Sequence, residues 1–224
     1  MPADILIHHL NKSRSERLCE CCLELGLDYK VKVWQRTSDF KAPPDLKAIH
    51  PLGKSPIAVV DGKTLSESAF ILTKFVQMQQ TSPAPFDDED TFWSHYAEGS
   101  FMLFLQMSRV LQQAASVTPF YAKTISTAFV GGIHDKYLDI EIQKHFDFVE
   151  AGLAKSATQW FGGKDDPSLA DYMMLYPIHA CISQPDRVKA TIGEKTRAWL
   201  KAVEARPAYK KGLERQTSEE KAKK

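Results

Sequence analysis

Strand patterns and helical patterns occupy different parts of this chain of 224 residues. Up to about residue 80, the apolar runs "DILIHHL", "YKVKVWQ" and "PIAVVDGKTLSE" alternate with amphipathic stretches. After the polar, proline-marked "QQTSPAPFDDED", the patterns are helical. The order strand, helix, strand, two short strands about "DGK" and helix predicts a small mixed sheet with helices on its faces. We therefore expect a sheet domain at 1–80, a linker at 81–90 and an all-helical domain at 91–224.

The expected helical domain contains four long amphipathic or apolar stretches. They are "DTFWSHYAEGSFMLFLQMSRVLQQAAS", "KYLDIEIQKHFDFVEAGLAKS", "PSLADYMMLYPIHACI" and "EKTRAWLKAVEARPAY". In "SLAD", Ser168 and Asp171 have the spacing of a capping box, so we assign them to folding. The final "GLERQTSEEKAKK" is strongly charged, and we expect it to fray.

Composition and charge exclude several classes of protein. A hydrophobic content of 43% is enough for one large core or two smaller ones. Lys and Arg number 29 against 28 Asp and Glu, so the formal charge is +1 and the chain lacks the basic field that attracts nucleic acid. The N-terminus has no secretory pattern, and no apolar window approaches the roughly 20 residues of a spanning helix. We expect a cytoplasmic protein that binds neither nucleic acid nor membrane.

Three of the four cysteines lie together in "RLCECCLELGL". Clustered thiols of this kind fit a reducing compartment rather than a disulfide framework. Cys19 and Cys22 have the spacing of a thiol-redox motif, but reactive pairs lie at a helix N-terminus, and this helix is expected to begin near Ser13. We therefore expect all four thiols, Cys181 included, to be dispensable for catalysis.

A proline follows Ser55 at the start of the apolar run "PIAVV". Proline lacks the N–H that a central strand uses, so Pro56 should lie at a strand start or at an edge, and we expect one edge to be open. Ser55 could then offer its main chain to an extended peptide. Glu67 and Ser68 begin the next helix, where free N–H groups attract a carboxylate. A small acidic peptide would fit both features, and a cis bond before Pro56 would turn them toward each other.

Four segments in this order, "HHLNKSRSER", "HPLGKSP", "LSESAFIL" and "SLADYMML", resemble cytosolic glutathione transferases over Ile5 to about Tyr209. They are most similar to a fungal and bacterial, serine-type and theta-like branch. The resemblance implies an α/β thioredoxin-like N-terminal domain, an all-α C-terminal domain and glutathione as co-substrate. It also implies transfer to a hydrophobic electrophile, peroxidase activity toward a hydroperoxide, and a homodimer. Leu52 stands where some classes place an aromatic dimer key, so a lock-and-key dimer is not expected.

In the family, a group at the first helix start stabilises the glutathione thiolate. A free thiol has a pKa of about 8.5, and each unit of depression needs about 1.4 kcal/mol of preference for the anion. Ser13 matches the catalytic serine of the serine classes. The same residue opens "SRSE", a capping box with Glu16, so its alternative role is a helix cap. Asn11, Arg14 and the N–H groups of the first helical turn remain alternative donors.

The resemblance assigns the two ends of glutathione to other residues. Glu67 would receive the γ-glutamyl ammonium and Ser68 the γ-glutamyl carboxylate, while Ser55 would pair its main chain with the cysteinyl unit. The alternative role of Glu67 and Ser68 is to complement the helix dipole.

Three further residues match binding positions more weakly. Lys41 and Lys54 match positions that neutralise the glycyl carboxylate, and Glu98 matches a position that reaches the γ-glutamyl amine across a dimer. Each of the three has an ordinary solvated surface residue as its alternative.

The electrophile site has no comparable motif. Apolar surface is offered by Phe101, Met102, Phe104, Leu105, Trp160 and Tyr176, although stripes at helical spacing are more often core. Two other functions therefore stay open. One is a non-catalytic glutathione-binding or regulatory protein on the same fold, and the other is a thiol oxidoreductase, which would need a cysteine where Ser13 stands.

Overall fold

The computed structural model describes residues 2–79, 86–183 and 188–221 and forms two compact units. The first unit comprises Met1–Asp87 and Lys201–Lys224, and the second comprises Asp88–Leu200. The segment from Lys201 thus groups with the first unit instead of with the predicted domain at 91–224. Much of the predicted linker at 81–90 lies outside the described residues, and its last three residues belong to a helix.

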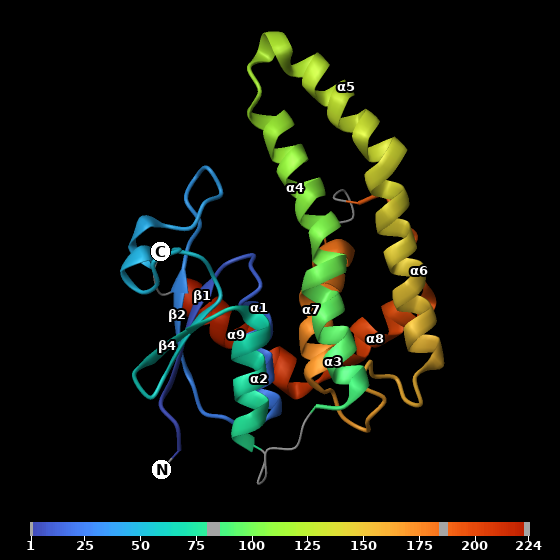
Figure 1. Ribbon diagram of the computed structural model, residues 1–224. Coiled ribbons are helices and arrows are strands. Elements are labelled where there is room, and N and C mark those ends of the chain that lie inside the picture. Colours follow the sequence, from blue (N-terminus) through green and yellow to red (C-terminus); the bar gives the residue numbers. More distant parts are fainter. Residues whose placement is uncertain (1, 80–85, 184–187, 222–224) are drawn as a thin grey trace. The chain divides into compact units, whose positions relative to one another are not determined.

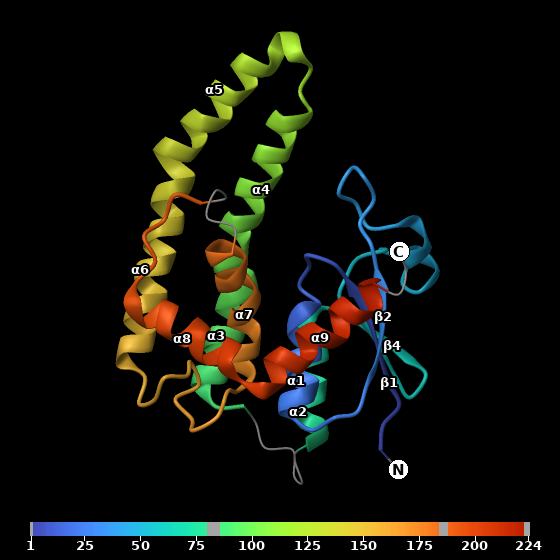
Figure 2. The ribbon, with the colours of Figure 1, turned by 180° about the vertical axis from the view of Figure 1, so that it is seen from behind.

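The first unit is a four-stranded sheet with helices around it, shown in Figures 1 and 2. Its elements are β1 (Ile5–Leu10), α1 (Glu16–Glu24), β2 (Lys30–Trp34), the 3-10 helix η1 (Pro44–Ala48), β3 (Ile57–Val60), β4 (Lys63–Ser66), α2 (Ser68–Gln79) and α9 (Pro207–Lys221). The strand order is β2-β1-β3-β4, with β1 and β2 parallel and the other pairs antiparallel. The mixed, thioredoxin-like sheet predicted from the sequence is confirmed.

The two inner strands, β1 and β3, contain or adjoin three residues of interest. These are the buried histidines His8 and His9 of β1 and Pro56, which precedes β3. β1 carries His8 and His9, which are both buried and point to opposite faces because side chains alternate along a strand. On one face, Trp34 Nε1 donates to His8 Nδ1 at 3.1 Å. Pro56 immediately precedes β3, so the strand-start alternative is correct. The expectation of an open edge there is wrong, since β3 lies between β1 and β4.

Helix α1 begins at Glu16 with Ser15 at its N-cap position, later than predicted. Ser13 is therefore not the N-cap that the predicted capping box requires, and its Oγ instead accepts the Ser15 N–H at 3.3 Å. The helix is followed by Gly26 at a φ of +65°, a value that glycine adopts without strain.

The cysteines of α1 point into the interior of the unit. Cys19, Cys21 and Cys22 are buried, and burial raises the pKa of the Cys19 thiol to about 11. Burial raises the pKa of the Cys21 and Cys22 thiols well above the usual value too. Protonated, buried thiols are poor nucleophiles, which disfavours the thiol-redox interpretation.

The predicted fraying of the C-terminal segment is wrong for the residues described, because α9 packs against α1 and β2. Gly212 lies at this contact, where a Cβ would be 3.5 Å from the Glu20 backbone nitrogen of α1, an ordinary van der Waals distance. Gln216 Nε2 donates to the Glu16 carbonyl at 3.3 Å. Just before α9, Arg206 forms a two-pronged ion pair with Glu24 at 2.5 and 2.7 Å.

The second unit is helical throughout its regular structure. Its elements are α3 (Asp88–Tyr96), the π-helical η2 (Ala97–Phe101), α4 (Met102–Val117), the 3-10 helix η3 (Phe120–Ala122), α5 (Lys123–Ile133), the π-helical η4 (His134–Leu138), α6 (Asp139–Lys155), α7 (Leu169–Ile182) and the start of α8 (Glu194–Ala205). The helical composition is confirmed. No helix is predicted from the sequence at α5, whose side chains are not buried and which contains two adjacent glycines. In Figures 1 and 2, α4 and α5 form a long hairpin. None of the helices in the described ranges is long and apolar enough to cross a membrane.

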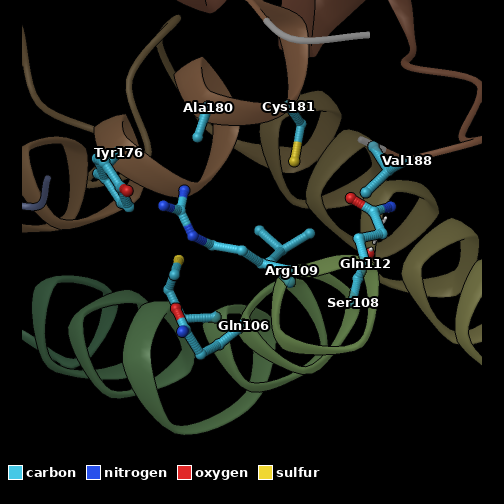
Figure 3. A pocket seen from close by; sticks show the side chains of 10 residues that line it. Gln106, Ser108, Arg109, Gln112, Tyr176, Ala180, Cys181 and Val188 are labelled. Carbon is cyan, nitrogen blue, oxygen red and sulfur yellow. Dashed lines mark hydrogen bonds between the residues drawn. The ribbon is translucent and has the colours of Figure 1, made fainter. Parts of the chain in front are cut away.

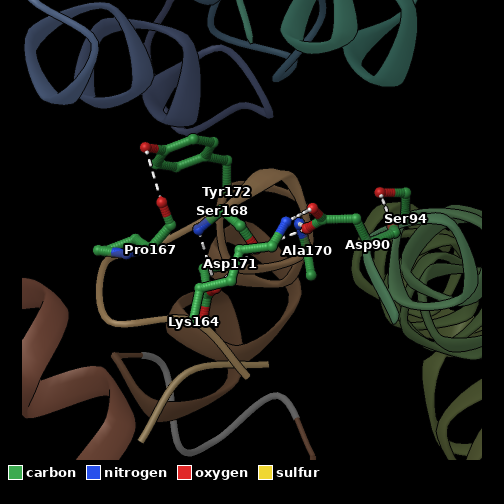
Figure 4. Close-up of polar contacts among 8 residues, drawn as sticks. All are labelled: Asp90, Ser94, Lys164, Pro167, Ser168, Ala170, Asp171 and Tyr172. Carbon is green, nitrogen blue, oxygen red and sulfur yellow. Dashed lines mark hydrogen bonds and ion pairs between the residues drawn. The ribbon is translucent and has the colours of Figure 1, made fainter. Parts of the chain in front are cut away.

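A buried carboxylate of α3 caps the start of α7, as Figure 4 shows. The predicted capping box is confirmed, with the Ser168 N–H donating to Asp171 Oδ2 at 3.1 Å. Asp90 on α3 is only 1% exposed, and it accepts the Ala170 N–H at 2.9 Å and the Ser168 hydroxyl at 2.5 Å. Lys164 forms an ion pair with the same carboxylate. These contacts support a folding role for the "SLAD" motif.

Candidate functional site

The turn between β1 and α1 meets the residue that precedes β3. Ser13 Oγ lies 2.8 Å from Ser15 Oγ and 3.2 Å from Ser55 Oγ, although Ser13 and Ser55 are 42 residues apart. The Ser55–Pro56 peptide bond is cis, as the sequence analysis considered. Ser13 is 5% exposed, so its hydroxyl lies at the edge of the unit's interior.

The register of β3 and β4 brings Glu67 and Ser68, at the start of α2, close to Ser55. Ile57 pairs with Ser66, so Ser55, two residues before Ile57, lies beside Glu67 and Ser68, which follow β4. Ser13, Ser55, Glu67 and Ser68 are thus grouped at one end of the sheet.

Glu67 has an unusual backbone at this point. Its φ is +72°, in the left-handed region that few non-glycine residues adopt, and its carbonyl accepts the Ile71 N–H at 3.0 Å. Strained residues of this kind persist where the surrounding structure holds them, and they cluster at ligand sites. The conformation leaves the Glu67 side chain exposed beside the first turn of α2, whose free N–H groups suit a carboxylate.

Asn11, one of the alternative thiol donors, uses its side chain to hold the adjacent loop. Its Nδ2 donates to Gln35 Oε1 at 2.8 Å, and its Oδ1 accepts the Arg36 N–H at 2.9 Å. Ser13, in contrast, joins other hydroxyl groups. The geometry favours Ser13 over Asn11, while Arg14 and the first-turn N–H groups stay as alternatives.

The three weaker candidates differ in their surroundings. Lys41 is exposed and pairs with Asp39 at 2.7 Å, a hydrogen bond that raises the pKa of Lys41 and lowers that of Asp39 to about 2. Lys54 is exposed next to Ser55. Glu98 is half-buried on η2 of the second unit and is not part of the group in the first unit. Their roles toward glutathione stay predictions.

A small cavity lies in the second unit between α4 and α7, as Figure 3 shows. It is lined by Met102, Leu105, Gln106, Ser108, Arg109, Gln112, Tyr176, Ala180, Cys181 and Val188. Its volume of about 30 Å³ has room for about two water molecules. Met102, Leu105 and Tyr176 belong to the apolar set selected from the sequence, whereas Phe101 and Trp160 are buried core residues.

One wall of this cavity is polar, a feature that no sequence motif indicates. Ser108 Oγ lies 3.4 Å from His134 Nε2, and Gln112 Nε2 donates to Ser108 Oγ at 3.4 Å. His134 Nδ1 in turn lies 2.8 Å from Asp139 Oδ1. No motif joins these residues, because the contact depends on the packing of α4 against η4. Among the described residues, no group of three or more His, Cys, Asp or Glu side chains is placed to hold a metal ion.

Comparison with known sequences identifies close relatives of this chain. The family described as "Glutathione S-transferase, N-terminal domain" matches residues 14–76. Glutathione S-transferase 3 of Schizosaccharomyces pombe is 35% identical over 217 residues, which cover 94% of this chain and 87% of the relative. Glutathione S-transferase 1 of Saccharomyces cerevisiae is 30% identical over 218 residues, which cover 92% of each chain.

Solved structures share the fold of this chain. A glutathione S-transferase of Actinobacillus pleuropneumoniae aligns with a TM-score of 0.70 at 24% identity, over 95% of this chain and 93% of the other. A glutathione transferase of Phanerochaete chrysosporium, solved with oxidized glutathione, aligns with a TM-score of 0.70 at 15% identity, over 97% of both chains. Because the two yeast relatives are at least 30% identical over nearly the whole sequence, the chain belongs to the glutathione S-transferase family.

Proposed function

We propose that this protein activates the thiol of glutathione as a thiolate, through the hydroxyl of Ser13, for attack on electrophilic small molecules. As a glutathione S-transferase, it takes glutathione as its co-substrate. The observation that carries the proposal is the grouping of the Ser13 hydroxyl, 3.2 Å from Ser55 Oγ, with the start of α2 at one end of the sheet. Thiol activation and peptide binding would thus occur at one place.

In the proposed binding mode, the γ-glutamyl carboxylate accepts hydrogen bonds from N–H groups of the first turn of α2 and from the hydroxyl of Ser68. The γ-glutamyl ammonium pairs with Glu67, whose exposed carboxylate lies at the same helix end. The main chain of Ser55 pairs with the cysteinyl unit. Lys41 and Lys54 neutralise the glycyl carboxylate at the other end of the peptide.

In the proposed reaction, Ser13 donates a hydrogen bond to the thiolate sulfur, which lowers the thiol pKa, and the thiol proton passes to solvent. The sulfur forms a bond to the electrophilic carbon, and the electron pair leaves with the displaced group or moves onto the acceptor. With a hydroperoxide, the thiolate attacks the terminal oxygen and forms glutathione sulfenic acid as the O–O bond breaks, and the alkoxide that leaves takes a proton from solvent to give an alcohol. A second glutathione then converts the sulfenic acid to oxidized glutathione and water.

The small cavity between α4 and α7 is the proposed electrophile site. It combines apolar walls with a hydrogen-bonding side at Ser108, Arg109 and Gln112, the usual composition of a small-molecule pocket. Its volume of about 30 Å³ is far below the several hundred Å³ of a drug-sized site, so side chains must move when a large acceptor binds. In Figure 3 the Arg109 side chain extends across the cavity, which makes it the first candidate to move.

We also infer a cytoplasmic homodimer that acts in detoxification. The apolar surface of α4 and α5 supports self-association, because Leu103, Val110, Ile125 and Phe129 are all more than half exposed. Leu52, at the position of the aromatic key of some classes, is also exposed.

A glutathione-dependent assay with a panel of carbon electrophiles and hydroperoxides tests the proposed function. Turnover above the uncatalysed rate, with saturation in glutathione, is the expected result. Calorimetric titration of glutathione should accompany the assay. Tight binding without turnover toward any member of the panel would favour the alternative, a non-catalytic glutathione-binding or regulatory protein.

Glu67→Ala should weaken glutathione binding by about tenfold to a hundredfold, because a hydrogen bond to a charged group contributes roughly 1.5–3 kcal/mol. Calorimetric titration measures the change. The matched control is Glu67→Gln, which keeps the side-chain length and an acceptor oxygen but not the charge. Its affinity for glutathione should lie between those of the wild-type protein and Glu67→Ala. An unchanged affinity in Glu67→Ala would remove this residue from the binding site.

A further inference from the structure

A chain of hydrogen-bonding groups connects the inner strand β1 to Ser13. His9 Nδ1 lies 3.0 Å from Ser15 Oγ, and Ser15 Oγ lies 2.8 Å from Ser13 Oγ. His9 is 3% exposed and Ser15 is fully buried, so protein groups rather than bulk water decide where the protons of this chain lie. Neither residue has a role in the proposed function above.

The capacity of Ser15 limits how these groups can pair. Its hydroxyl has one proton and two lone pairs, and one lone pair accepts the Leu10 N–H at 3.1 Å. The Ser15 proton can be donated to the Leu10 carbonyl, which lies 3.3 Å away. The second lone pair is then contested between His9 and Ser13.

The tautomer of His9 decides this competition. A ring with its proton on Nδ1 donates to Ser15, fills the second lone pair and leaves no place there for the Ser13 proton. A ring with its proton on Nε2 leaves that lone pair open, and Ser13 can donate inward. Ser13 Oγ accepts the Ser15 N–H at 3.3 Å in either case.

We propose that His9 is a positioning residue which, as its Nδ1–H tautomer and through Ser15, directs the Ser13 hydroxyl proton outward to the glutathione sulfur. The inference rests on the proposed role of Ser13 as thiolate donor. In the absence of glutathione, the outward neighbour is Ser55 Oγ at 3.2 Å. Burial lowers the pKa of His9 to about 4, so the ring is neutral at neutral pH and the tautomer is the property that varies.

Nitrogen-15 NMR of the histidine-labelled wild-type protein tests the tautomer. Protonated and bare ring nitrogens give well-separated shifts, and the His9→Asn variant identifies the His9 signals among the seven histidines. Protonated Nδ1 and bare Nε2 are expected. The opposite assignment would overturn the proposal, whatever the variants do.

A pair of variants tests the effect on the thiol. His9→Ala removes the donor to Ser15, whereas His9→Asn places an amide N–H near the position of Nδ1–H. His9→Ala should raise the pKa of bound glutathione, followed by thiolate absorbance, by about half a unit to one unit. The kcat/KM at neutral pH should fall about threefold to tenfold, and His9→Asn should restore most of both values. A purely structural role would lower the melting temperature but leave the thiol pKa unchanged.

The same measurements on Ser13→Ala and on the double variant separate the two proposals. If Ser13→Ala raises the thiol pKa and adding His9→Ala raises it no further, both proposals are supported. If Ser13→Ala raises the pKa and His9→Ala does not, only the role of His9 is overturned. If Ser13→Ala changes nothing, the proposed donor is wrong and the role of His9 falls with it. Should His9→Ala fail to fold, the NMR result on the wild-type protein decides.

Discussion

Replacement of Ser13 by alanine should raise the pKa of enzyme-bound glutathione by about one to two units. The reason is the loss of a charge-assisted hydrogen bond to the thiolate, which contributes roughly 1.5–3 kcal/mol. Turnover at neutral pH should fall roughly tenfold and by no more than about thirtyfold, because a thiol with the free pKa of about 8.5 is still about 3% ionised at pH 7. Part of the rate should return at higher pH, where the thiol ionises without help. Thiolate absorbance against pH and the pH dependence of kcat/KM measure both effects.

The control for this substitution is Ser13→Thr, which retains a hydroxyl and should keep most of the wild-type pKa and rate. Melting temperatures must be compared, because Ser13 Oγ accepts the Ser15 N–H and alanine removes that contact. If Ser13→Ala keeps both the thiol pKa and the rate, Ser13 is not the donor. Asn11, Arg14 and the N–H groups at the start of α1 would then be the remaining candidates.

Asp171→Ala should destabilise the protein by at least about 3 kcal/mol. The buried carboxylate accepts the Phe161 N–H at 2.9 Å, the Trp199 Nε1–H at 2.8 Å and the Ser168 N–H at 3.1 Å. Alanine leaves all three donors unpaired, and each buried unpaired donor costs about 1–3 kcal/mol. For a chain of this length, the melting temperature should drop by about 10 °C or more, as followed by circular dichroism.

Two variants calibrate that loss. Asp171→Asn keeps one acceptor oxygen and should be destabilised less than Asp171→Ala. Asp147→Ala removes an exposed carboxylate that accepts only the Gln143 amide among the contacts described, and it should change stability by less than about 0.5 kcal/mol. A loss for Asp171→Ala as small as that of Asp147→Ala would show that the cluster around α7 does not hold the second unit together.

The regular elements of the first unit follow from local patterns, so the sequence predicts them well. Strand alternation, the "DGK" turn and the amphipathic stretch after β1 depend on residues close together in the chain. The predicted start of α1, near Ser13, is wrong for a reason that is also local. The turn after β1 passes through Lys12 at a φ of +52°, and the helix then begins after Ser15 rather than after Ser13.

The candidate site was predictable only as separate motifs. Nothing local indicates that the Ser13 and Ser55 hydroxyl groups meet, because their contact depends on the pairing of β1 with β3. The partnership of His9 with Ser15 likewise depends on which face of β1 the ring occupies. The left-handed backbone of Glu67 has no signal in its residue type, since such values usually belong to glycine or asparagine.

Fraying of the C-terminal segment is the wrong prediction because it considers the total charge of the segment and not the distribution of its side chains over the faces of a helix. Helix α9 presents Gly212 and Gln216 to α1, while Arg215 lies with its guanidinium 4.8 Å from the Tyr29 ring. A long charged side chain can cover apolar surface with its stem and its planar head and still keep its charge near water. A strongly charged sequence can therefore form a packed helix.

The packing of α9 on α1 also sets an order of events during synthesis on the ribosome. Strands β1 to β4 and helices α1 and α2 emerge first, but the surface of α1 that packs against α9 stays uncovered until Gly212 and Gln216 have been translated, about 190 residues after Glu24, where α1 ends. Throughout that interval, the nascent chain carries an incomplete first unit while the second unit is made. The N-terminal unit is thus the first to begin folding and the last to be finished.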